Sequence, residues 1–324
     1  MASFASSTSG LTTRQKNLHW DHNPIQTQMG NGLVNVIPFN RALHSAGLLR
    51  LYEEAFAGGD AITSPTHHAD LAQMLQQMAT STGFVCVVDG GGVVGGITVY
   101  DHPQRKDVCI VANLVTDVRF RRRGIASGVL RGVIRAAKQR RLTHVALQVD
   151  ATNEAAIGLY QSFGFERVGE VAYLTLDSAV MPRAYVSRTC QVRPADSADA
   201  ATLLRLIQIN IPRSLTLTEQ GIAVTDDAIT WWVGKESGKL IGAMCSQLTK
   251  GAVEIELMLD PKASRELGTG FLLDVLRHSL RPNATHIIAK QSAHALMNLW
   301  VLRNCGFSET MSILHFSLQL SQSL

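Results

Sequence analysis

At 324 residues the chain is long for a single hydrophobic core and suits two domains of roughly 150 residues each. Hydrophobic residues make up 46% and charged residues 17%, which excludes wholesale disorder, while a net charge of +4 is too small to indicate nucleic-acid binding. Five single cysteines without a CxxC pair indicate neither a disulfide framework nor a zinc site, and no apolar run approaches the roughly 18 residues of a membrane helix.

Residues 1–20 are rich in serine and threonine, contain Arg14 and Lys16, and lack acidic residues. This composition fits a floppy N-terminal tail and equally an organellar transit peptide. No apolar segment follows the charges, so a secretory signal is not expected. We predict a flexible tail over residues 1–32 of a cytoplasmic protein, with organellar import as the alternative.

The residues after the tail predict an alternation of helices and strands. A helical segment comes first, and a glycine-rich turn then separates two apolar strands, as in a β-hairpin. A third strand, a loop with Gly124 and an apolar helix follow. A further strand, a helix that ends at Gly164 and Phe165, and a final strand complete this half of the chain. The expected segments are a helix at 41–56 and strands at 84–88, 93–100, 108–118 and 144–150.

The second half of the chain repeats this order, which indicates a tandem duplication. Three glycine-bearing patterns recur at nearly one offset, pairing Gly96 with Gly242, Gly124 with Gly268, and Gly164 with Gly306. We predict domains over 33–178 and 190–324, joined by a linker over 179–189 that contains Pro182. The fold class is α/β, with a mixed, mostly antiparallel sheet flanked by helices in each domain.

The stretch RFRRRGIASGVL, residues 119–130, places arginines and a glycine directly before an apolar helix. The first N–H groups of a helix lack internal partners and lie at the positive end of the helix dipole. Glycine leaves no side chain between this backbone and a ligand. An ordinary capped helix after a solvated basic turn is the alternative. We predict a cradle for phosphate or pyrophosphate, formed by Arg121, Arg122, Arg123, Gly124, Ile125, Ala126 and Ser127.

A second motif, NEAAIGLYQSFGF at residues 153–165, follows after a linking strand. The order R-x-x-G-x-A, then N-x-x-A-x-x-x-Y-x-x-x-G-F, resembles the GNAT superfamily of acetyl-CoA-dependent acyltransferases. The resemblance covers residues 34–177 with complete motifs and residues 190–320 in part. It implies two tandem GNAT-like domains, of which the second is degenerate.

The resemblance also implies a cofactor site, with acetyl-CoA as the acetyl donor and no metal. The end of the third strand would offer its backbone to the pantetheine arm, and one N–H near Val115 or Thr116 would steady the oxyanion. Tyr160 would protonate the departing thiolate as a general acid; a core tyrosine with a satisfied hydroxyl is the alternative. The remaining residues that the resemblance places at the cofactor are Asp117, Val118, Asn153 and Ala156.

The base that accepts the proton of the amine stays open. Some family members have an aspartate on the third strand where this chain has Asn113, and Asp117 is expected to face solvent. Asp101, His102 and Asp107 flank the entrance of that strand and are candidates for a proton relay. His102 is the one that titrates near neutral pH.

The second copy keeps parts of the motifs. Arg265, Gly268, Thr269 and Gly270 predict a possible second cofactor loop, one residue longer than is usual in the family that the motifs resemble. Leu302 and Ala295 replace the tyrosine and the asparagine, and leucine cannot protonate a thiolate. Glu254 and Glu256 share one face of a strand and are candidate bases. We expect a degenerate domain that packs on the first and helps to shape the acceptor cleft.

Three functions compete at this stage. The leading one is transfer of an acetyl group to a primary amine of a small molecule. The alternatives are a protein acceptor, at an N-terminus or a lysine, and a non-catalytic acyl-CoA-binding module. Partners among nucleic acids and membranes are not expected, and a homodimer is left open. The acceptor is expected to contact variable loops such as 57–71, where His67 and His68 are equally surface residues or ligands.

Overall fold

The computed structural model describes residues 25–29, 32–56, 82–88, 90–102, 105–181, 190–211, 229–249, 252–279 and 284–321. Residues 1–24 of the expected tail, most of the expected linker, and the loop with His67 and His68 lie outside these ranges. Within them, no helix is long and apolar enough to cross a membrane.

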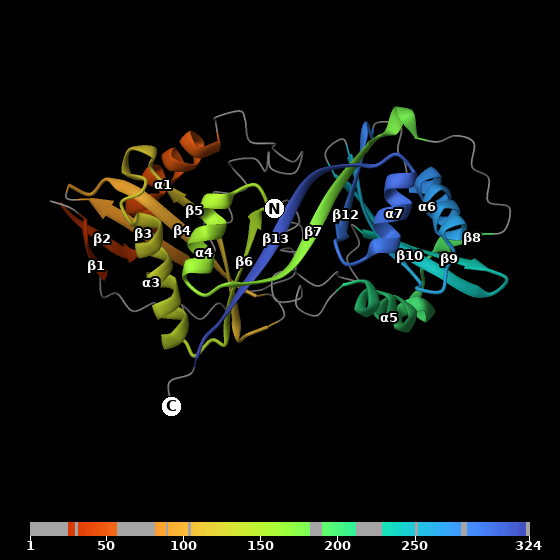
Figure 1. The fold of residues 1–324 in the computed structure, drawn as a ribbon, viewed down its shortest axis with the longest axis horizontal. Coiled ribbons are helices and arrows are strands. Elements are labelled where there is room, and N and C mark those ends of the chain that lie inside the picture. The colour runs from red at the N-terminus through yellow and green to blue at the C-terminus, as the bar shows by residue number, and fades with distance from the viewer. Residues whose placement is uncertain are drawn as a thin grey trace. The chain divides into compact units, whose positions relative to one another are not determined.

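The chain divides into two compact units (Figure 1). Unit 1 comprises Met1–Val149, Asn153–Arg167 and Phe316–Leu324, and unit 2 comprises Asp150–Thr152 and Val168–His315. Unit 1 contains these elements: β1 Ile25–Met29, β2 Gly32–Pro38, α1 Arg41–Phe56, β3 Thr82–Val88, β4 Val93–Asp101, β5 Val108–Thr116, a 3-10 turn at Val118–Phe120, α3 Ile125–Gln139, β6 His144–Asp150 up to Val149, and α4 Glu154–Ser162. The next strand, β7 Glu166–Asp177, begins in unit 1 and continues in unit 2 from Val168.

The sheet of unit 1 is mixed. Its strands follow the order β1-β2-β3-β4-β5-β6, and all neighbours up to β5 pair antiparallel. The pair β5 and β6 is parallel because α3 crosses over between them. This arrangement confirms the predicted α/β class with a mixed sheet flanked by helices.

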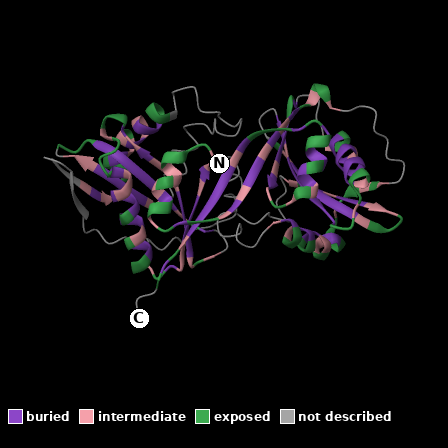
Figure 2. Cartoon of the chain, in the orientation of Figure 1, coloured by how far each residue is buried: buried purple, intermediate pink, exposed green. Residues whose placement is uncertain are grey.

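Strand β4 is buried on both faces because a helix covers each side. Its burial runs without a break from Val93 to Val99. A Cβ at Gly96 would lie 2.6 Å from Leu48 of α1, and a Cβ at Gly95 would lie 2.4 Å from Ile125 of α3. The two glycines therefore allow α1 and α3 to approach opposite faces of one strand closely. Figure 2 shows the resulting pattern, with strands largely buried and helices exposed along their outer sides.

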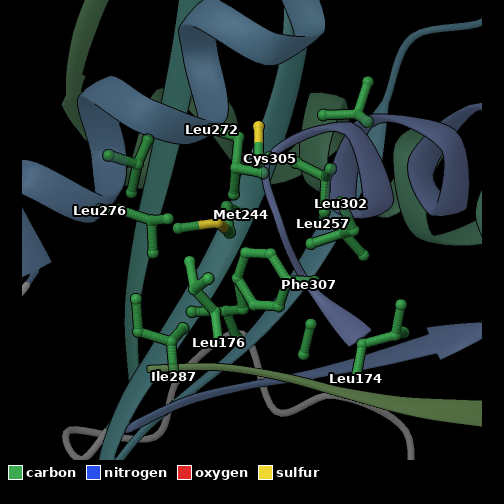
Figure 3. Close-up of a cluster of buried hydrophobic side chains, with 14 of the residues drawn as sticks. Leu174, Leu176, Met244, Leu257, Leu272, Leu276, Ile287, Leu302, Cys305 and Phe307 are labelled. Carbon is green, nitrogen blue, oxygen red and sulfur yellow. The ribbon is translucent and has the colours of Figure 1, made fainter. Parts of the chain in front are cut away.

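Unit 2 repeats the plan, which agrees with a duplication. It contains β8 Gln191–Pro194, α5 Ala200–Asn210, β9 Ile229–Glu236, β10 Lys239–Thr249, β11 Ala252–Leu259, α6 Arg265–Ser279, β12 His286–Ser292, α7 Leu296–Asn304 and most of β13 Ser308–Gln319, with short 3-10 turns at Ser178–Val180 and Ser197–Asp199. Side chains from α6 and α7, including Leu272, Leu276 and Leu302, enter one apolar cluster with Leu257 and Phe307 (Figure 3). Helix α5 packs on the other face, against Trp231, Val233 and Met258.

The last strand of each repeat is exchanged. Strand β7 belongs to the first copy by sequence, yet from Val168 it lies in unit 2 and pairs antiparallel with β12. The end of β13 belongs to unit 1, where the Leu320 amide donates to the Thr143 carbonyl at 2.8 Å. The units therefore differ from the predicted domains 33–178 and 190–324 at their ends, and β1 also lies inside the predicted tail. Both exchanged strands carry similar apolar patterns, so the sequence does not reveal which neighbour each one joins.

Candidate active site

A bulge in β5 opens the site of unit 1. The register of β4 and β5 shifts between the Gly96 and Thr98 pairs, so that Asn113 is an extra residue in β5. Asn113 has a φ of 55°, in the left-handed region that asparagine tolerates better than most residues. Its backbone carbonyl accepts a hydrogen bond of 2.8 Å from the hydroxyl of Tyr52, a buried residue of α1, and its side-chain amide donates to Thr98 Oγ1 at 3.1 Å.

Beyond the bulge, one edge of β5 has no neighbouring strand. Strand β6 pairs with β5 from Val108 to Val111 and then diverges. The amide of Asp117 donates to the Val94 carbonyl at 2.9 Å, and backbone groups of successive residues point to alternate sides. The N–H and C=O groups of Leu114 and Thr116 therefore face the side that β6 has left. The pairing with β6, which ends at Val111, does not reach them, so this edge can pair with an extended ligand.

The predicted cofactor residues at the end of β5 differ in the direction of their backbone groups. Thr116 directs its backbone groups toward the side that β6 has left, whereas Val115 and Asp117 direct theirs toward β4. Val118 begins a 3-10 turn, and its side chain is exposed. Leu114, which the sequence analysis did not include, faces the same open edge as Thr116. A bulge does not interrupt an apolar strand pattern, so the sequence carries no signal for this shift by one residue.

Asp117 is not a solvent-facing residue, and that expectation is wrong. It is only 2% exposed and accepts hydrogen bonds from the Arg119 amide and guanidinium at 2.8 to 3.0 Å. Arg50 of α1 lies 3.4 Å from its carboxylate. The hydrogen bond from Arg119 is the main reason that the pKa of Asp117 falls to about 2. Asp117 therefore fixes the end of β5 as a permanent anion, and it is not a base.

The loop before α3 presents free backbone N–H groups, as the cradle prediction requires. Gly124, the N-cap of α3, has a φ of 78° and no side chain to cap the helix. The amides of Ile125, Ala126 and Ser127 find no acceptor within the described ranges. These donors and the helix dipole make the turn suited to an anion.

The arginines before Gly124 divide into two groups. Arg119 is paired with Asp117, and the Arg123 guanidinium lies 5.4 Å from the centre of the Phe120 ring. Arg121 and Arg122 are exposed, and Arg122 has a φ of 61°. Two of the four arginines thus shape the turn through internal contacts, while Arg121 and Arg122 leave their charge available to a phosphate.

Helix α4 brings the second motif toward the same end of the sheet. Asn153 is its N-cap, and its side-chain oxygen accepts from the Ala156 amide at 3.1 Å. Asn153 therefore acts on the helix itself, and a direct cofactor contact stays a prediction. Ala156 is partly buried in the first turn and adds no bulk beyond a methyl group.

Tyr160 lies in the last turn of α4, only 7% exposed, with its ring 5.8 Å from that of Phe165. Burial raises the pKa of its hydroxyl to about 12. The group therefore keeps its proton at neutral pH and can donate it, which is what a general acid requires.

The predicted relay residues are engaged elsewhere. Arg140 pairs with Asp101 at 2.7 Å, and Arg105 pairs with Asp107 at 2.7 Å. Hydrogen bonds from Arg105 hold the pKa of Asp107 well below its usual range, and His102 accepts from the Arg105 amide. All of them surround the turn at the start of β5, at the end of the strand opposite to Thr116. These contacts stabilise the turn, and a relay role for these groups stays a prediction.

The residues of the predicted second cofactor loop do not form a loop in the structure. In unit 2 the Asp260 amide donates to the Ile241 carbonyl at 2.8 Å, so Asp260 corresponds to Asp117. Helix α6 begins at Arg265, much sooner after Asp260 than α3 begins after Asp117. The segment between Asp260 and α6 is therefore shorter than the corresponding segment of unit 1, and it contains no counterpart of the unit 1 arginines. Four predicted loop residues instead lie inside α6: Arg265, Gly268, Thr269 and Gly270.

Gly268 matches Gly128 and not Gly124. The Gly268 amide donates to the Ser264 carbonyl at 3.0 Å, as the Gly128 amide donates to Gly124 at 2.8 Å. A Cβ at Gly268 would lie 2.8 Å from Leu259. This glycine thus serves close packing of α6 on β11, and it forms no turn.

The candidate bases of unit 2 share a face, as expected from strand alternation. Glu254 and Glu256 lie on the same side of β11 as Met258, which packs against α5. Helices α6 and α7 cover the opposite face. Across the described ranges, no group of three or more His, Cys, Asp or Glu side chains is placed to hold a metal ion.

Comparison with known proteins assigns the first unit to a family. Residues 47–165 match the sequence model of the Acetyltransferase (GNAT) family. N-acetyltransferase 8 of Rattus norvegicus is 30% identical over 108 residues, which cover 32% of this chain and 49% of that protein. N-acetylaspartate synthetase of Homo sapiens is 34% identical over 104 residues, which cover 32% of this chain and 34% of that protein. The chain spans about half the length of these curated relatives, or less.

Solved structures resemble both units together. A GCN5-related N-acetyltransferase from Sphaerobacter thermophilus has a TM-score of 0.62 at 16% identity, covering 88% of this chain and 95% of that chain. A tandem GNAT protein from the clavulanic acid biosynthesis pathway has a TM-score of 0.58 at 15% identity, covering 90% and 100%. At these identities the likeness concerns the fold, and it confirms the tandem of two GNAT-like domains. Residues 47–165 of this chain form an acetyltransferase (GNAT) family domain.

Proposed function

We propose that the chain transfers an acetyl group from acetyl-CoA to a primary amine of a small molecule. The observation that carries this proposal is the combination, in unit 1, of an edge of β5 at Leu114 and Thr116 that the pairing with β6 does not reach, and amides without an acceptor at the start of α3. An acyl-CoA has an extended amide-bearing arm and a diphosphate, which match these two sets of donors and acceptors. The GNAT family domain at residues 47–165 supports the same donor.

Two groups of residues in unit 1 would bind two different parts of the cofactor. The amides of Ile125, Ala126 and Ser127, together with Arg121 and Arg122, would hold the diphosphate. The backbone of Leu114 and Thr116 would pair with the arm as a neighbouring strand does.

The amine nitrogen would form a bond to the thioester carbon as the C–S bond breaks, which needs a polarised carbonyl and a proton donated to the sulfur. The proton that the amine loses would pass to water, which restores the proton of the donor. Acetyl-CoA, when bound, supplies a thioester whose carbonyl carbon is open to attack by an amine. The amides of Leu114 and Thr116 are the donors available to its oxygen. Tyr160, protonated at neutral pH, is the donor available to the leaving sulfur.

A small-molecule acceptor is favoured by the relatives. N-acetylaspartate synthetase, 34% identical over the matched segment, is named for an acetylated amino acid. By analogy, the acceptor of this chain is an amine of low molecular weight. A protein acceptor is the other outcome that the experiment distinguishes.

The test is a thiol-release assay with acetyl-CoA, a panel of amino acids and small amines, and peptides with free N-termini or lysines. Turnover with members of the small-amine set and not with the peptides is the expected result. Turnover with peptides alone would show that the acceptor is a protein and not a small molecule. Absence of both turnover and acetyl-CoA binding would refute the enzyme proposal as a whole.

A further inference from the structure

The open edge of β5 in unit 1 has a counterpart in unit 2 that is filled by the chain itself. Strand β12 pairs with β11 from Ala252 to Ile255 and then diverges, as β6 leaves β5. The backbone of Leu257 and Leu259 is therefore in the position of Leu114 and Thr116.

The side chain of Asn298 occupies this edge. Its amide nitrogen donates to the Leu257 carbonyl at 2.7 Å, and its oxygen accepts from the Leu259 amide at 3.3 Å. The residue is 1% exposed. One carboxamide thus makes the pair of bonds that an extended amide-bearing ligand would make along a strand edge.

A second asparagine completes the bridge. Asn210, at the end of α5, accepts from the Asn298 side chain at 2.8 Å and donates to the Leu259 carbonyl at 3.2 Å. It also donates to the Leu206 carbonyl within its own helix. The buried carboxamides are therefore well partnered, and their replacement by a ligand would leave polar groups without partners.

The position of Asn298 corresponds to Ala156 in unit 1. Each stands three residues after the N-cap of its helix, and the caps Asn153 and Ala295 have nearly equal angles, with φ of −85° and −84°. Unit 1 thus has a methyl group where unit 2 has a carboxamide. The two units differ at this point by one side chain that can either leave the edge open or fill it.

The start of α6, which corresponds to the predicted anion-binding start of α3, is also occupied by groups of the chain itself. Ser264 Oγ accepts from the Leu267 amide at 3.2 Å, so the first turn of α6 has a side-chain cap, which α3 lacks. Glu266 adds a negative charge to the same turn. The Arg265 guanidinium lies 4.7 Å from the centre of the Trp300 ring, on the helix and away from any phosphate loop.

We propose that Asn298 closes the acyl-CoA slot of unit 2 from within, so that the chain binds one equivalent of acetyl-CoA, in unit 1. The side chain at position 156 in unit 1, or 298 in unit 2, decides whether the strand edge of that unit can bind an acyl-CoA. This inference rests on the proposed function for unit 1, but the state of unit 2 can be measured separately.

The first experiment measures acetyl-CoA binding by calorimetry on the full chain. Wild type is expected to bind one equivalent and Gly124→Glu none. Ala156→Asn, which places the same carboxamide at the open edge, is expected to bind at least tenfold more weakly. Ala155→Asn, at the exposed neighbouring position of α4, is the matched control and should bind like wild type. Two equivalents in wild type, one remaining equivalent in Gly124→Glu, or unchanged binding by Ala156→Asn would overturn the proposal.

The second experiment needs no bound ligand. The Leu259 amide should exchange its hydrogen slowly in the ligand-free full chain, and faster in Asn298→Ala. Asn210→Ala removes the outer part of the bridge, retains the bond from Leu259 to Asn298, and should leave this amide protected. Rapid exchange at Leu259 in wild type would overturn the closure. A wild type that binds no acetyl-CoA but protects Leu259 would refute the enzyme proposal and support the closure of unit 2.

Discussion

The Tyr52 hydroxyl donates a 2.8 Å hydrogen bond to the carbonyl of Asn113, the extra residue of the β5 bulge. Unit 2 offers an internal comparison. Arg50 contacts Asp117 in unit 1, and Arg205 contacts Asp260 at the corresponding position of unit 2. Tyr52 follows Arg50 by two positions in its helix, so the residue of unit 2 that takes its place is Ile207. In unit 2 the strands β10 and β11 pair without a register shift at the position where unit 1 has the bulge. The bulge and the hydroxyl thus occur together and are lost together.

Tyr52→Phe should weaken the bulge without changing the packing of the ring. The substitution leaves the Asn113 carbonyl without its donor in a buried setting, which costs about 1–3 kcal/mol of folding free energy. Denaturant unfolding measures this loss. Because the bulge sets the direction of the Leu114 and Thr116 backbone, acetyl-CoA affinity should fall as well. Unchanged stability and unchanged affinity together would show that the hydroxyl does not hold the bulge.

Tyr160→Phe should lower kcat by about a hundredfold or more, the usual contribution of a general acid. Affinity for acetyl-CoA should change little, because the ring remains. The pKa of about 12 also predicts that Tyr160 stays protonated below that pH, so an activity loss between pH 8 and 10 would arise from another group. Steady-state kinetics and calorimetry on the same variant separate the two effects, and a wild-type kcat would refute the role.

Asp117→Asn should remove an acid-sensitive part of the stability. The folded-state pKa of about 2 lies below the ordinary value of 3.8, and the hydrogen bond from Arg119 is the main cause. A lowered pKa contributes stability that is present above about pH 4 and is lost as pH falls toward 2. The shift corresponds to about 2 kcal/mol. Unfolding free energies at pH 3 and pH 7 should therefore differ less in the variant, and equal pH dependence would contradict the assignment.

Gly124→Ala should impair both folding and anion binding. At a φ of 78° an L side chain costs about 1 kcal/mol, and the new methyl group stands at the amides of the cradle. Gly238 has the same φ of 78° in a turn of unit 2, with nothing near its absent Cβ. Gly238→Ala is thus the matched control: similar destabilisation with wild-type affinity for acetyl-CoA. Equal affinities in the two variants would argue against a cradle at Gly124.

The sequence was sufficient for the order of the elements, the glycine turn before α3, and the position of Tyr160, because each depends on local pattern. The bulge at Asn113 was not predictable, since one inserted residue does not alter the apolar character of a strand. Gly268 was misassigned because the sequence does not distinguish a glycine needed for close helix packing from one needed in a turn. Asn298 had no sequence signal at all, since its meaning depends on which strand edge its helix faces.

The reciprocal placement of β7 and β13 affects how the two repeats can be separated. By sequence each repeat ends with a strand that completes the sheet of the other copy. Either half expressed alone would expose a bare sheet edge where its borrowed strand belongs, and such edges promote aggregation. A cut between the repeats would therefore leave each half without one strand of its own sheet.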